Sequence, residues 1–154
     1  MTTTVDTHVL VYASDTGAPE HARAQALLEH LAAGPDLVVL LWPTLMGYLR
    51  IVTHPSICGA PLPFDVAQAN IDALLALPHT RSADETPEFW SAFTRVAADV
   101  PVRGNLVPDA QIVALMRTHG VRHIWSRDRD LRRFDAVTVT DPFDERYATR
   151  FPRR

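Results

Sequence analysis

The stretch LVVLL at residues 37–41 is an unbroken apolar run, with Pro35 before it and Pro43 after it. Its length and its branched side chains favour a β-strand over a helix. A strand with one face in water alternates apolar and polar residues, so an unbroken run indicates burial on both faces. Strands of that kind are typical of a parallel sheet covered by helices on each side. This stretch therefore predicts an α/β fold.

The rest of the chain alternates between strand and helix patterns, as a parallel sheet requires. Further strands are expected at residues 3–6, 121–125 and 136–140, and helices at 20–33, 43–53, 65–77, 87–98 and 108–119, with shorter helical turns at 7–13 and 128–134. The tryptophans Trp42, Trp90 and Trp125 fall in these patterns and are expected in the core. We predict one three-layer α/β/α sandwich with a central parallel sheet over residues 1–142. The Arg-rich residues 143–154 are expected to form a weakly held C-terminal tail.

The composition is that of an ordinary globular domain. The chain has 154 residues, of which 47% are hydrophobic and 21% charged, and a formal net charge of −3. This balance argues against disorder and against wrapping nucleic acid by bulk charge, but it permits a local basic strip. The single cysteine, Cys58, excludes an internal disulfide and a zinc site built from cysteines. With no export leader and no apolar span of about 20 residues, we expect a cytoplasmic protein without membrane association.

The absence of lysine excludes several enzyme classes. All 15 basic residues counted as lysine or arginine are arginines. Schiff-base chemistry needs an amine that can lose its proton, which arginine cannot supply. A P-loop needs a lysine on the phosphates, and neither that motif nor the glycine fingerprint of a dinucleotide-binding site occurs.

Three aspartates fall where an α/β sheet collects ligands, outside the carboxyl ends of its strands. Asp6 closes the first expected strand, Asp109 lies in the first turn of an expected helix, and Asp128 follows the strand at 121–125. Asp109 and Asp128 also suit a structural role, because acidic residues at helix starts complement the helix dipole. From the residues alone, both interpretations stay open for these two.

Asp6 is harder to explain as a structural residue, because apolar residues surround it in the sequence. A buried carboxylate needs a partner, and several carboxylates in one pocket raise one another's pKa. A hard divalent cation with oxygen ligands resolves both problems, and magnesium or manganese fits better than zinc. Such an ion can activate water and hold phosphate oxygens. The spacing therefore favours a metal site.

Four segments of the chain form an ordered set of motifs. They are VDTHVLVYA at residues 5–13, WPTLMGYLRIVTHP at 42–55, NLVPDAQIVALMRTHG at 105–120 and SRDRDLRRF at 126–134. Together, in this order and at these intervals, they resemble the PIN domains of VapC-type toxins from toxin–antitoxin pairs. The resemblance implies a PIN-like fold and a magnesium- or manganese-dependent endoribonuclease that cleaves transfer RNA or ribosomal RNA to inhibit translation. It also implies a cognate antitoxin protein and a homodimer.

The resemblance implies roles for individual residues as well. Asp6, Asp109 and Asp128 would be catalytic metal ligands, Asp109 in the pattern DA-x-x-x-A-L, which reads DAQIVAL here. SRDRDL resembles the family's T-x-D-x-D-F, with Ser126 in the place of threonine. Asp130 would be an outer partner of the metal site, and Ser126 would orient a carboxylate or a water molecule. A purely structural role for Ser126 is the alternative.

The chain departs from the family pattern at Gly47. The family usually carries a glutamate on the helix after the second strand, and alignment on Leu49 and Arg50 puts Gly47 at that position. One negative charge fewer favours one tightly held ion over two. Two alternative functions follow: a PIN-fold module that binds RNA or a partner with little or no catalysis, and a metal-dependent DNA nuclease or phosphatase.

Four arginines are candidates for binding RNA phosphates, namely Arg50, Arg122, Arg127 and Arg129. The last three flank the Asp128 segment and would form an electropositive rim around an acidic centre, which suits a nuclease. The alternative is that they face solvent and pair with neighbouring aspartates.

Overall fold

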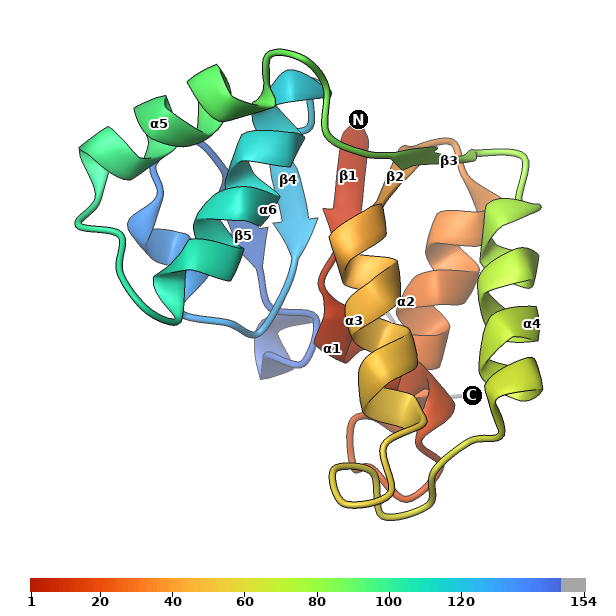
Figure 1. The fold of residues 1–154 in the computed structure, drawn as a ribbon. Helices are drawn as coiled ribbons and strands as arrows, with labels where there is room; N and C mark the ends of the chain where they lie inside the picture. Colours follow the sequence, from red (N-terminus) through yellow and green to blue (C-terminus); the bar gives the residue numbers. More distant parts are fainter. Residues whose placement is uncertain (148–154) are drawn as a thin grey trace.

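The computed structural model describes residues 1–147, and this part of the chain forms one five-stranded sheet (Figure 1). Its strands are β1 (Thr2–Val5), β2 (Leu37–Leu41), β3 (Thr80–Ala83), β4 (His123–Trp125) and β5 (Thr138–Thr140). They lie in the order β3-β2-β1-β4-β5, and each neighbouring pair is parallel. β1 is first in the sequence but lies at the centre of the sheet. The predicted parallel sheet is confirmed.

Helices cover both faces of the sheet. α1 (Thr7–Ser14), α2 (His21–Ala33), α3 (Trp42–Val52) and α4 (Phe64–Leu75) lie on one side, and α5 (Phe89–Asp99) and α6 (Leu106–Thr118) lie on the other (Figure 1). Two short 3-10 helices span Asp130–Arg133 and Glu145–Tyr147. None of the helices within residues 1–147 is long and apolar enough to cross a membrane.

β2 packs against both helical layers. Val38 and Leu40 belong to the core cluster formed with α1–α4. Val39 and Leu41 belong to the cluster formed with α5 and α6. Successive side chains of a strand point to opposite faces, so this division confirms that β2 is buried on both sides.

β3 is an edge strand that the sequence patterns did not predict. Its sequence is TRSA, and its two middle residues, Arg81 and Ser82, are exposed. It pairs with β2 through residues 80–83. An edge strand needs few buried side chains and often carries charge, so backbone pairing holds β3 without leaving an apolar period in the sequence.

The segment that follows β5 is held by the core. Phe143 is 8% exposed and belongs to the cluster formed with α1–α4. Its ring meets Tyr12 edge-on with centroids 5.3 Å apart, and its carbonyl oxygen accepts a hydrogen bond from Arg23 Nη1 at 2.6 Å. The weakly held tail expected from residue 143 therefore does not begin there. The rest of that tail, residues 148–154, lies outside the described residues.

Trp90 is not a core residue, contrary to the expectation from its helical pattern. It is 68% exposed on α5 and stacks on Phe93, with ring centroids 5.6 Å apart and an interplanar angle of 14°. Val96 is the buried residue of α5. α5 lies at the periphery, so a residue at the margin of its apolar stripe stays in water.

Leu41 and Leu37 provide a matched test of the burial of β2. Leu41 is fully buried, whereas Leu37 at the start of the same strand is 37% exposed. We expect Leu41→Ala to lower the free energy of unfolding by about 3 kcal/mol, because removing buried methyl groups leaves a cavity. Leu37→Ala should lower it by less than about 1 kcal/mol. Urea denaturation would measure both values, and equal losses would contradict the two-sided burial.

Candidate active site

The first strand ends directly beside β4. Val5 pairs with Trp125 in the parallel register, and the backbone N–H of Asp6 donates to the carbonyl oxygen of Trp125 at 3.0 Å. Asp6 and Ser126 therefore follow neighbouring strands at the same edge of the sheet, although 120 positions separate them in the sequence. Parallel α/β sheets bind their ligands at this edge.

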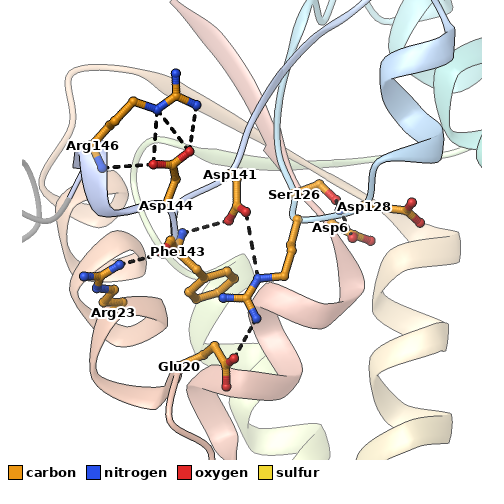
Figure 2. Close-up of polar contacts among 10 residues, drawn as sticks. Asp6, Glu20, Arg23, Ser126, Asp128, Asp141, Phe143, Asp144 and Arg146 are labelled. Carbon is orange, nitrogen blue, oxygen red and sulfur yellow. Dashed lines mark hydrogen bonds and ion pairs between the residues drawn. The ribbon is translucent and has the colours of Figure 1, made fainter.

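Ser126 connects two of the predicted site residues. It is fully buried, and its hydroxyl donates to Asp6 Oδ2 at 2.7 Å. Ser126 Oγ also accepts a hydrogen bond from the N–H of Asp128 at 2.9 Å, and Asp128 Oδ1 accepts one from the N–H of Asp130 at 2.8 Å. Figure 2 shows Asp6, Ser126 and Asp128 lying together. Ser126 thus orients both the Asp6 carboxylate and the loop of residues 126–130.

The Asp6 carboxylate is largely withdrawn from water, with 21% of its side chain exposed. This burial raises its pKa above the ordinary value, and the charge of Asp128 acts in the same direction. The hydrogen bond from Ser126, the charge of His8 and the N–H of Thr7 oppose the rise. His8 Nδ1 lies 4.0 Å from Asp6 Oδ2 on an exposed side chain. A cation near Asp6 would favour the ionised carboxylate and so oppose the rise in its pKa.

Asp109 reaches the site from the other helical layer, in the first turn of α6. Its pKa is raised to about 6, first because partial burial desolvates it, and then because the charges of Asp128, Asp130 and Asp6 disfavour its ionised form. A carboxylate that only stabilised a helix start would have a lowered pKa, because the helix dipole favours negative charge there. The raised pKa therefore favours the functional interpretation. The structure therefore places Asp6, Asp128 and Asp130 near enough to Asp109 for their charges to act on it.

The donor chemistry of these aspartates fits a hard divalent cation. They offer carboxylate oxygens, which Mg²⁺ and Mn²⁺ prefer. Burial first, and neighbouring aspartates second, raise the pKa values of Asp6 and Asp109, and a bound cation would favour their ionised forms. Within residues 1–147, no group of three or more histidine, cysteine, aspartate or glutamate side chains is close enough to hold an ion in this arrangement. Three of these carboxylates would have to move toward one another to bind one ion together, whereas Mg²⁺ is usually held by one or two carboxylates and several water molecules.

Gly47 lies on α3 against the first residue of α1. A Cβ atom at residue 47 would lie 3.2 Å from Thr7 Oγ1 and 3.3 Å from Thr7 Cγ2, which is tighter than ordinary packing. Thr7 follows Asp6 directly, and its hydroxyl donates to the carbonyl oxygen of Thr44 at 3.4 Å. A side chain at residue 47 would have to displace Thr7. α3 thus approaches the site through a glycine and supplies no carboxylate.

Three of the arginines considered for RNA binding lie in different places. Arg129 is exposed in the 126–130 loop, and Arg50 is exposed in the last turn of α3. Arg122 immediately precedes β4 and therefore lies at the amino end of that strand, the opposite end from the aspartates. The structure does not bring Arg122 to the site.

Arg127, the fourth arginine, is engaged by protein groups. Its Nη1 donates to Glu20 Oε1 at 2.6 Å, and its Nε lies 3.9 Å from Asp141 Oδ2. The sequence patterns did not point to Glu20 or Asp141. Glu20 and Arg127 are 107 positions apart, and neither acid lies in a recognisable motif. These charges meet only in the fold.

A parallel sheet with β1 at its centre and aspartates along its carboxyl edge matches the architecture that the sequence motifs imply. The sequence profile of the PIN domain matches residues 3–137, and the chain therefore belongs to the PIN-domain family. Ribonuclease VapC48 of Mycobacterium tuberculosis is 51% identical over 143 residues, covering 93% of this chain and 99% of the relative. Within the PIN family, the chain is a member of the VapC-type ribonucleases.

Further relatives agree with this assignment. Ribonuclease VapC43 of M. tuberculosis is 36% identical over 141 residues, covering 91% of this chain and 95% of the relative. Among solved structures, VapBC2 from Rickettsia felis, bound to a promoter DNA fragment, gives a TM-score of 0.67 at 14% identity, covering 91% of this chain and 98% of that one. M. tuberculosis VapC20, described as a sarcin-ricin loop cleaving toxin, gives 0.63 at 19% identity, covering 88% and 98%. These likenesses confirm the PIN-like three-layer fold.

The raised pKa of Asp109 predicts how the metal-free protein responds to pH. Its folded pKa of about 6 exceeds the ordinary value of 3.8, so the folded state binds the proton more tightly, and this stabilisation is lost as the pH rises through 6. We expect Asp109→Asn to raise the free energy of unfolding by about 1 kcal/mol at pH 8, a value limited by solvent screening. Near pH 4 the substitution should change little. Denaturation in chelator at both values would measure the effect.

Asp65→Asn is the matched control for this measurement. Asp65 is also an acidic residue in the first turn of a helix, α4, and it is exposed. It should give no gain in stability at pH 8, because neutralising it removes a favourable interaction with the helix dipole. A loss of stability in Asp109→Asn at pH 8 would contradict the proposal that burial and neighbouring aspartates disfavour the ionised form of Asp109.

Proposed function

We propose that this protein is a magnesium- or manganese-dependent endoribonuclease that hydrolyses RNA phosphodiester bonds and thereby inhibits translation. The observation that carries the proposal is the hydrogen-bonded set of Asp6, Ser126 and Asp128 at the carboxyl edge of the sheet, with Asp109 near enough for aspartate charges to help raise its pKa. Perturbed pKa values of this kind cluster at functional sites. The relatives that are named ribonucleases supply the reaction class.

The metal would be held by the carboxylate oxygens of Asp6, Asp109 and Asp128. A divalent ion bound there would lower the pKa of a water molecule and would place positive charge beside the phosphate. Ser126 holds the Asp6 carboxylate in one orientation through its hydrogen bond. Asp130 adds negative charge next to Asp109, and its N–H fixes the Asp128 carboxylate. These residues hold and orient the groups that the reaction needs.

Arg50 and Arg129 are the proposed contacts to RNA phosphates, since both are exposed. The chain has a net charge of −3, so attraction to RNA has to come from local arginines. The proposed substrates are transfer RNA and ribosomal RNA. A solved neighbour described as a sarcin-ricin loop cleaving toxin supports an RNA substrate.

The proposed partner is a cognate antitoxin protein that covers the acidic edge and prevents RNA from reaching it. The solved neighbours include VapBC2 from Rickettsia felis and VapBC-1 from Haemophilus influenzae, which supports such a pairing. We also propose a homodimer formed through helical faces, and a cytoplasmic location, where the RNA of translation is found.

Asp6→Asn and Asp109→Asn test the metal site directly. Each should reduce RNA cleavage by more than about 100-fold, because outer partners of metal ligands alone contribute 10–100-fold. Magnesium or manganese at about 100 times its Kd should raise the Tm of the wild-type protein by about 5–10 °C, and either variant should lose most of this shift. Asp65→Asn should retain both properties. An equal metal-induced shift in all four proteins would mean that the ion binds elsewhere.

A substrate panel separates the proposed function from its alternatives. RNA, DNA and a simple phosphoester would be incubated with the protein in magnesium, in manganese and in chelator. The proposal requires metal-dependent cleavage of RNA alone. Cleavage of DNA or of the phosphoester would identify the nuclease or phosphatase alternative, RNA binding without cleavage would identify a binding module, and RNA cleavage in chelator would contradict the metal mechanism.

Ser126→Ala tests the hydrogen bonds that connect Asp6 to the 126–130 loop. Loss of the hydroxyl should lower cleavage by about 10–100-fold, as for other outer partners of metal ligands. The hydrogen bond from Ser126 lowers the pKa of Asp6, so its loss should also shift the acid limb of the pH–activity profile to higher pH. Ser126→Thr keeps a hydroxyl and should retain most of the activity. A normal pH profile in Ser126→Ala would assign Ser126 a purely structural role.

A further inference from the structure

Arg127 occupies a special position in the site, because it lies between Ser126 and Asp128. Ser126 donates to the Asp6 carboxylate, and Asp128 is the proposed ligand next along the chain. Contacts that hold the Arg127 side chain in place therefore also hold the backbone between Ser126 and Asp128. The contacts of the guanidinium show which groups hold it.

Protein groups surround the Arg127 guanidinium on several sides. Its Nη1 donates to Glu20 Oε1 at 2.6 Å, and its Nε lies 3.9 Å from Asp141 Oδ2. The guanidinium carbon lies 4.5 Å from the centroid of the Phe143 ring and 6.0 Å from that of Tyr12, which are cation–π distances. We name the set of Arg127, Glu20, Asp141, Phe143 and Tyr12 the Arg127 clasp.

The outer members of the clasp are themselves fixed. Phe143 is buried, its N–H donates to Asp141 Oδ1 at 2.8 Å, and its carbonyl oxygen accepts from Arg23 Nη1 at 2.6 Å. Arg23 also donates to Glu145 at 3.1 Å. Figure 2 shows Arg23, Phe143 and Asp141 to the left of Asp6, Ser126 and Asp128. The clasp thus joins the 126–130 loop to α1, to the start of α2 and to the buried segment after β5.

The positive charge of Arg127 is already compensated inside the clasp. Arg127 faces two carboxylates, those of Glu20 and Asp141, and its hydrogen bond lowers the pKa of Glu20. Both carboxylates are less exposed than the arginine. Binding an RNA phosphate through Nη1 or Nε would compete with partners that hold Arg127 by charge, hydrogen bond and ring contact at once.

We propose that Arg127 is a positioning residue, which holds the 126–130 loop so that Ser126 and Asp128 keep their places beside Asp6. The inference rests on the proposed function of the acidic site. It assigns Glu20 and Asp141 as the anchors of that position. The competing assignment is that Arg127 contacts RNA directly, as its place in the sequence motif first indicates.

Binding of Mn²⁺ to the RNA-free protein separates positioning from simple charge effects. Arg127→Gln removes a positive charge near the aspartates, so electrostatics alone would make Mn²⁺ bind more tightly. Loss of positioning should instead weaken Mn²⁺ binding by about 10-fold, as happens when outer partners of metal ligands are removed. Arg127→Lys keeps the charge but not the planar fork, and should weaken binding in the same direction. Electron paramagnetic resonance of free Mn²⁺ would measure the affinities.

Cleavage kinetics of Glu20→Gln give a second test, because the two assignments of Arg127 predict different changes in KM and kcat. If Arg127 contacts RNA, removing its competing carboxylate releases it and should lower KM. If Arg127 positions the loop, Glu20→Gln should lower kcat by about 10-fold and leave KM within a factor of two. Arg146→Gln is the matched control, because Arg146 forms an exposed ion pair with Asp144 outside the clasp. It should match the wild type in both measurements.

The outcomes separate the role of Arg127 from the proposed cleavage of RNA. Weaker Mn²⁺ binding in both Arg127 variants, together with a kcat effect in Glu20→Gln, supports the clasp. Tighter Mn²⁺ binding in Arg127→Gln, or a lower KM with unchanged kcat in Glu20→Gln, overturns it. A wild-type protein that binds Mn²⁺ but does not cleave RNA overturns the proposed function, while the Mn²⁺ comparison still decides whether Arg127 positions the loop. If Arg127→Gln does not fold, Arg127→Lys and Glu20→Gln carry the test.

Discussion

The hydrogen bond from the N–H of Asp6 to the carbonyl oxygen of Trp125 completes the pairing of β1 with β4 at the carboxyl edge of the sheet. The rest of the site depends on this pairing. It sets Ser126 beside the Asp6 carboxylate, and Ser126 in turn orients the backbone of Asp128. A shift of one residue in the register would turn every side chain of β1 to the other face and would separate Asp6 from Ser126.

The site breaks two local rules of helix formation, which is typical of positions that serve a function. Asp6 stands at the N-cap of α1, where its carboxylate would ordinarily accept a hydrogen bond from the helix, yet it makes no side-chain capping bond and turns to Ser126 instead. Asp109 lies in the first turn of α6 with a raised pKa, although the helix dipole favours its ionised form there. Both carboxylates lose part of the stabilisation that a helix start offers, and both add to the negative charge of the site.

Sequence patterns predicted the features that depend on residues close together in the sequence or on where a strand ends. The unbroken apolar run of β2 predicted two-sided burial, and the rule for parallel sheets brought Asp6, Asp109 and Asp128 to one edge. β3 and Phe143 were not predicted. The edge strand is held by backbone pairing, and Phe143 is held by contacts with residues more than a hundred positions away. The contact of Glu20 with Arg127 was missed for the same physical reason, since an ion pair between distant segments leaves no period in the sequence.

The central place of β1 in the sheet has a consequence for synthesis of the chain. β1 leaves the ribosome first, but one of its two neighbours, β4, is translated near the end. The nascent chain can form α1–α4 against β1 and β2 early, whereas the groups from α6 and from the loop after β4 arrive later. Asp6 therefore lies beside an unpaired edge of β1 until the last third of the protein has been synthesised. A truncated product released before residue 123 would carry the first carboxylate without its serine or Asp128, and so would lack an assembled acidic centre.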